Sequence, residues 1–171
     1  MDDLIIEPKL GIGKITLGMS MKEVEACIAY YSKKHLGVDD DKNAIASSLQ
    51  VAYDPEGKVN FIHLDSRITK YFNCLFRGVD VFSTKVDLLV KMIDEISPYD
   101  RNHPELGCTF YFPEIGLGLW RPRIFNEEDQ LTKEFQELTP ENQEDELRNL
   151  YFEVVCIEKD YYKNAKKDYI K

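Results

Sequence analysis

A short internal repeat constrains the fold of this chain more than any other feature of its sequence. Residues 15–28 read ITLGMSMKEVEACI, residues 79–92 read VDVFSTKVDLLVKM, and the two align without a gap. In each copy, apolar residues first alternate as in a strand and then recur with helical spacing. We therefore predict two related units, each opening with a short strand that leads into a helix.

Both predicted helices begin at a capping sequence. In the first copy, Ser20 is followed three residues later by Glu23, which is the pattern of a capping box. Thr84 and Asp87 hold the same positions in the second copy, with a shorter acidic side chain. We predict that Ser20 and Thr84 are the N-caps of the two helices.

A pair of strand-like runs follows each predicted helix. Residues 51–53 and 59–63 flank the turn Asp-Pro-Glu-Gly, and residues 110–112 and 117–120 flank Pro-Glu-Ile-Gly. Pro and Gly between alternating runs indicate hairpins. Each unit thus has the order β-α-β-β. We predict an α+β fold in which the two units build one antiparallel sheet with helices on one face.

The C-terminal part lies outside the repeat. The apolar spacing predicts an acidic amphipathic helix over 127–138. Thr139 followed by Pro140 predicts the N-cap and first residue of another short helix. The apolar run 152–157 predicts a last strand, and the lysine-rich residues 163–171 predict a frayed or loosely helical end.

We interpret all 171 residues as a single domain, because this length suffices for one hydrophobic core and is short for two. Its predicted parts are repeat 1 (about 10–65), repeat 2 (about 72–122), the acidic helical segment with the last strand (126–158), and a tail (159–171).

The negative charge of the chain is concentrated in one segment. Residues 126–146 contain nine acidic residues and one lysine, a net charge of −8, whereas the whole chain has −9. This asymmetry disfavours direct nucleic-acid binding and favours a basic protein partner. Trp120 and Arg121, at the end of a predicted strand, are residue types that often anchor interfaces. The predicted partner-binding residues are Glu127, Glu128, Asp129, Glu134, Glu137, Glu144, Asp145, Glu146, Trp120 and Arg121.

The sequence shows no convergent set of reactive groups. His35, His63 and His103 form no zinc-binding spacing, and no phosphate-binding glycine motif is present. His63 and Asp65 share a face of a predicted strand, while His103 lies near Cys108 in a predicted loop. We predict no catalytic site, no metal and no cofactor. An enzyme would need a deep pocket that joins these histidines to Cys108 or to clustered acids.

The amino terminus has neither the basic nor the apolar region of an export signal, and no stretch reaches the ~18–20 apolar residues that cross a bilayer. We therefore expect a cytoplasmic protein without membrane contact. Its cysteines are expected to be reduced core residues; they are Cys27, Cys74, Cys108 and Cys156.

Two resemblances follow from these motifs. Residues 18–24, Gly-Met-Ser-Met-Lys-Glu-Val, resemble the helix start of β-lactamase-inhibitor-like and outer-membrane assembly lipoprotein domains, which are exported. Over residues 10–125 the chain is more similar to cytosolic immunity proteins of bacterial polymorphic and contact-dependent-inhibition toxin systems. That similarity rests on the same helix start, the paired repeats and the strand Gly-Leu-Gly-Leu-Trp at 116–120.

The immunity-protein resemblance implies an inhibitor that binds and neutralises a cognate toxin domain. A nuclease with a basic cleft would suit the acidic segment, and blocking such a cleft requires no catalytic group. The alternative is a non-enzymatic binding or assembly module of another bacterial complex. The sequence leaves open the partner, the contact surface and the oligomeric state.

Overall fold

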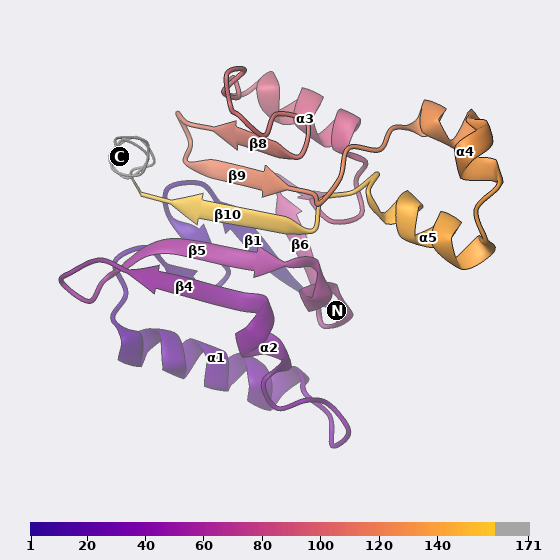
Figure 1. The fold of residues 1–171 in the computed structure, drawn as a ribbon. Coiled ribbons are helices and arrows are strands. Elements are labelled where there is room, and N and C mark those ends of the chain that lie inside the picture. The colour runs from indigo at the N-terminus through magenta and orange to yellow at the C-terminus, as the bar shows by residue number, and fades with distance from the viewer. Residues whose placement is uncertain (160–171) are drawn as a thin grey trace.

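The computed structural model describes residues 1–159 of the chain, which form two five-stranded sheets flanked by helices (Figure 1). The predicted α+β class is confirmed. The predicted lysine-rich end, residues 163–171, lies outside the described residues.

The first sheet contains β1 (Asp2–Glu7), β2 (Gly11–Ile12), β3 (Ile15–Thr16), β6 (Phe72–Phe76) and β7 (Val79–Asp80). The second contains β4 (Leu49–Tyr53), β5 (Val59–Asp65), β8 (Thr109–Phe112), β9 (Leu117–Trp120) and β10 (Val154–Glu158).

The strands are divided between two sheets, where the sequence indicated one. The orders are β3-β2-β1-β6-β7 and β4-β5-β10-β9-β8. The strands that precede the helices lie in the first sheet, and both predicted hairpins, β4–β5 and β8–β9, lie in the second. The division depends on β1 and β6, two strands that the sequence analysis missed, which pair in parallel at the middle of the first sheet.

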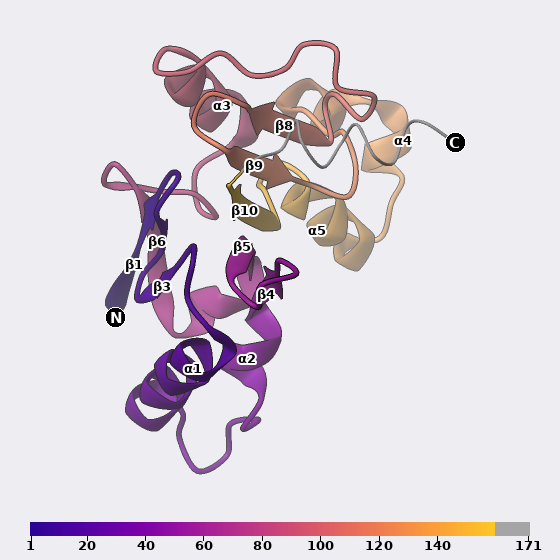
Figure 2. The same cartoon turned by 90° about the vertical axis from the view of Figure 1, so that its left-hand side faces the viewer.

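The helices of the two repeats lie at opposite ends of the molecule. These are α1 (Met21–His35) and α3 (Val86–Asp94), and Figure 2 shows the sheets between them. The short helix α2 (Ala44–Ser48) leads into β4, and the 3-10 helix η1 (Ser66–Lys70) leads from β5 towards β6. The core is continuous through both sheets, with α1 and α3 contributing residues such as Tyr31 and Leu89.

The two helix starts differ. At α1 the predicted capping box is present, and the Ser20 backbone N–H donates to Glu23 Oε2 at 2.8 Å. At α3 the prediction was wrong, because the N-cap is Lys85. The Thr84 hydroxyl instead donates to the Asp80 carbonyl at 2.6 Å, so it serves the turn after β7.

We expect Ser20→Ala to lower the free energy of unfolding by about 1 kcal/mol, because it removes the N-cap side chain of α1. Chemical denaturation followed by circular dichroism measures the change. Ser83→Ala is the matched control, because Ser83 is exposed and its hydroxyl makes no hydrogen bond within the described part of the chain. Equal stabilities of the two variants would contradict the prediction.

β10 is the predicted last strand, and it occupies the centre of the second sheet. It pairs antiparallel with β5 on one side and with β9 on the other. Its alternate residues Val155 and Ile157 are fully buried. The hairpins of the two repeats are therefore joined through a strand that belongs to neither.

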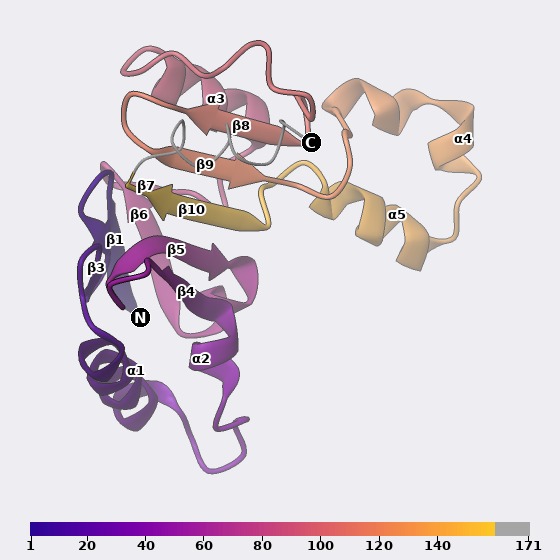
Figure 3. The ribbon, with the colours of Figure 1, turned by 60° about the vertical axis from the view of Figure 1, so that its left-hand side comes forward.

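The chain between β9 and β10 projects from the sheets (Figures 1 and 3). We call residues 122–149 the acidic arm. It contains the 3-10 helix η2 (Glu127–Leu131), α4 (Lys133–Gln136) and α5 (Pro140–Arg148). The predicted cap at Thr139 and Pro140 is confirmed. The predicted continuous helix over 127–138 is wrong, because Thr132 has an extended backbone and caps α4 by accepting from the Phe135 N–H.

Candidate protein-binding arm

A buried arginine holds the base of the acidic arm. Arg121 directly follows β9 and is only 3% exposed. Its Nε donates to the Gly107 carbonyl at 2.9 Å, and its Nη1 donates to the carbonyls of Phe125 and Asn149, each at 2.8 Å. Phe125 lies at the start of the arm and Asn149 at its end. One guanidinium thus ties both ends of the arm to the loop before β8.

This position corrects the prediction that Arg121 contacts a partner. Burial lowers the pKa of its guanidinium, while Asp87, as the strongest of the opposing charges, raises it. An arginine in folded proteins stays protonated even so, and its donors are directed to backbone oxygens inside the molecule. Trp120, by contrast, is 37% exposed and remains a candidate contact residue beside the base of the arm.

Basic residues that lie outside the acidic segment neutralise part of its charge. Glu127 pairs with Lys85 at the start of α3, and Glu146 Oε1 lies 2.5 Å from Arg123 Nη1. Arg148 lies 3.3 Å from Asp145 and 3.9 Å from Glu144. The sequence count missed these bases because it covered residues 126–146 only. The arm is therefore less negative than the sequence indicated.

Other acids of the arm differ in what they contact. Asp129 is half-buried, and its Oδ2 accepts from the Asn126 N–H at 2.6 Å in the capping box of η2, which gives it a structural role. Glu137 is exposed and pairs with Lys133 at 3.4 Å within one helical turn. Glu128, Glu134 and Glu141 are exposed and have no cationic partner among residues 1–159. These last three carry uncompensated charge at the surface.

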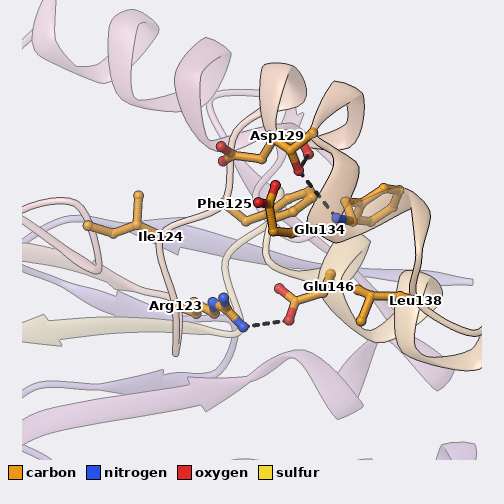
Figure 4. A pocket seen from close by; sticks show the side chains of 9 residues that line it. Arg123, Ile124, Phe125, Asp129, Glu134, Leu138 and Glu146 are labelled. Carbon is orange, nitrogen blue, oxygen red and sulfur yellow. Dashed lines mark hydrogen bonds and ion pairs between the residues drawn. The ribbon is translucent and has the colours of Figure 1, made fainter.

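A pocket of about 440 Å³ opens between the two halves of the arm (Figure 4). Phe125 and Phe135 pack there with ring centroids 5.5 Å apart. Glu134 comes from α4 and Glu146 from α5, and Glu146 Oε2 is buried without a hydrogen-bond partner in the described structure. The residues that line the pocket are Arg123, Ile124, Phe125, Asp129, Thr132, Glu134, Phe135, Leu138 and Glu146. No sequence pattern predicts this pocket, although the spacing of Phe135 and Leu138 indicates an apolar face.

The histidines and acids considered for chemistry make separate structural contacts. Asp65 accepts from the N–H and Nε of Arg67, at 2.8 and 2.7 Å, and so caps η1. Burial lowers the pKa of His63, and the negative charge of Asp65 opposes this shift. His103 Nδ1 accepts from the Glu105 N–H at 3.2 Å within its own loop. Within residues 1–159, no group of three or more histidine, cysteine or acidic side chains is placed to hold a metal ion.

The cysteines are all free, and two have strongly perturbed thiols. Burial raises the pKa of both Cys74 and Cys156 to about 12, so these thiols stay protonated at neutral pH. Cys74 belongs to the core, as predicted. Cys27 is half-buried and packs against the core, and Cys108 is half-buried.

Among the helices of residues 1–159, none has the length and apolar character needed to span a membrane. No family model, curated protein or solved structure matches this chain.

Proposed function

We propose that this protein is a cytoplasmic inhibitor that binds a basic surface of another protein through its acidic arm. The partner class is a cognate bacterial toxin domain with a basic cleft, such as a nuclease. The observation that carries the proposal is the set of exposed, unpaired carboxylates of Glu128, Glu134 and Glu141 on a segment that projects from the sheets.

The shape of the arm supports insertion into a concave partner surface. It extends from the sheets as a compact helical unit (Figure 3). The hydrogen bonds of Arg121 hold its two ends together at the base. A segment held in this way loses little conformational entropy when it binds, so more of the contact energy appears as affinity.

The charge of the arm supports a basic target. Carboxylates at a cleft that normally holds nucleic-acid phosphates occupy the places of those phosphates and exclude the substrate. Long-range attraction between the arm and such a cleft also accelerates encounter, most strongly at low ionic strength. Inhibition by occlusion requires shape and charge complementarity and no reactive group.

The test is affinity capture with two charge-reversal variants. The first carries Glu128→Lys, Glu134→Lys and Glu141→Lys on the arm. The control carries Glu25→Lys, Glu56→Lys and Glu114→Lys, three exposed acids outside the arm, and changes the formal charge equally. With bacterial lysate at low salt, wild type and control are expected to retain one basic protein. We expect the arm variant to bind it at least about 100-fold more weakly.

The captured protein is then purified and assayed for nuclease activity. We expect stoichiometric wild-type protein to abolish that activity and the arm variant to leave it intact. Capture of an acidic or neutral complex, with equal retention by both variants, would contradict the inhibitor proposal. That result would favour the alternative function as an assembly module.

A further inference from the structure

We propose that the pocket of the acidic arm is a receptor for one arginine side chain of the partner protein. This inference rests on the proposed function for the identity of the partner. It adds the place on the arm where one residue of the partner binds and the contacts that hold that residue. It starts from the pocket of about 440 Å³ between α4 and α5, whose size falls within the ~300–1,000 Å³ range of ligand sites.

The pocket combines apolar walls with acidic groups. Phe135 and Leu138 from the first half of the arm and Phe125 from its base provide apolar surface. Glu134 and Glu146 add carboxylates from two different helices. This arrangement fits a long side chain whose stem is apolar and whose end is cationic, as in arginine and lysine.

Glu146 has one carboxylate oxygen that no group in the described structure binds. Its Oε2 is buried and unpartnered in the described structure, although buried carboxylate oxygens are normally hydrogen-bonded. Its other oxygen meets Arg123, whose side chain is 66% exposed, so water screens that pair. A donor that enters the pocket would satisfy this second oxygen.

Arginine fits this pocket better than lysine. Its planar guanidinium stacks on aromatic rings, and Phe135 lies in the wall, tilted 42° to Phe125. Its five donors also reach carboxylates on two sides, whereas the lysine ammonium is a compact and strongly hydrated charge. We therefore expect an arginine anchor at the centre of the partner's contact surface.

The first test is an NMR titration of the intact protein with the blocked peptide acetyl-Gly-Arg-Gly-amide. The matched probes replace arginine by citrulline, which has the same shape without charge, and by lysine. We expect shifts centred on Phe135, Leu138 and Glu146 with the arginine peptide, and at least about tenfold weaker binding of the citrulline peptide. Shifts spread over all acidic helices, with no preference for arginine, would overturn the proposal.

Two variants separate binding from folding. Glu146→Gln keeps the size of the side chain, and Glu134→Gln changes an exposed residue without a partner in residues 1–159. Each is expected to weaken arginine-peptide binding about tenfold, whereas Glu56→Gln, at an exposed acid outside the arm, leaves it unchanged. Retained binding by the Glu134→Gln variant, checked as folded by its NMR spectrum, would overturn the proposal even if Glu146→Gln misfolds.

The same variants distinguish this inference from the proposed function. If the basic partner is lost only on reversal of Glu128, Glu134 and Glu141, and Glu146→Gln binds it normally, the pocket is not the receptor and the inhibitor function stands. If the arginine peptide binds in the pocket while no basic partner is captured, the receptor stands and the inhibitor function fails.

Discussion

Arg121→Ala is expected to lower the free energy of unfolding by about 3 kcal/mol, the largest effect we expect from any single change near the arm. The substitution removes the donors of three backbone carbonyls, those of Gly107, Phe125 and Asn149. It also leaves a cavity where a side chain with only 3% exposure was packed. A buried carbonyl without a hydrogen-bond donor destabilises the folded state. Water that enters the cavity replaces the lost hydrogen bonds only in part.

Urea denaturation measures this loss, and limited proteolysis shows where it acts. Because Arg121 ties both ends of the acidic arm, we expect cleavage within residues 122–149 before cleavage within the sheets. Arg123→Ala is the control, since Arg123 is exposed and its pair with Glu146 is expected to contribute less than about 1 kcal/mol. An Arg121→Ala variant with wild-type stability and an uncleaved arm would show that the guanidinium does not hold the base.

Phe72→Ala is expected to cost about 3–5 kcal/mol. Phe72, at the start of β6, is 1% exposed. Its ring makes an edge contact with Tyr31 at 5.2 Å between centroids and lies 4.4 Å from the ring of His35. Both partners belong to α1, so a side chain at the start of repeat 2 packs under the helix of repeat 1. Truncation therefore leaves a cavity at the junction of the two repeats.

Thermal and urea unfolding measure this second loss. Tyr30→Ala is the matched control, because Tyr30 is 47% exposed and touches the edge of Tyr31 from outside. We expect the control to lose about 1 kcal/mol or less. Similar losses for the two variants would mean that Phe72 does not hold the repeats together.

The features that the sequence predicted correctly depend on short-range interactions. The capping box at Ser20 involves a residue three positions away, and the cap at Thr139 with Pro140 is equally local. Both hairpins follow from alternating residues around turns that contain glycine. Even the failure at Thr84 was local, since its hydroxyl found a nearby carbonyl at Asp80 instead of the helix.

The features that the sequence could not predict depend on residues far apart in the chain. The division into two sheets follows from the parallel pairing of β1 with β6, which no local pattern announces. The burial of Arg121 follows from carbonyls that three separate segments bring to one point. The arm is less negative than the residue count indicates because Glu127 pairs with Lys85, the N-cap residue of α3. The position of the acidic residues along the chain could be read from the sequence, whereas the pocket between them and the hydrogen bonds of Arg121 could not.

The central place of β10 also has a consequence for how the protein is made. On the ribosome, every other strand within residues 1–159 is synthesised before β10, so the edges of β5 and β9 that pair with β10 are unpaired until then. Open edges pair readily with other chains, and they are a common cause of strand exchange and aggregation. The two hairpins are thus prone to aggregation in a nascent or prematurely terminated chain. Production of the protein should depend on chaperones that cover those edges until β10 is synthesised and pairs with them.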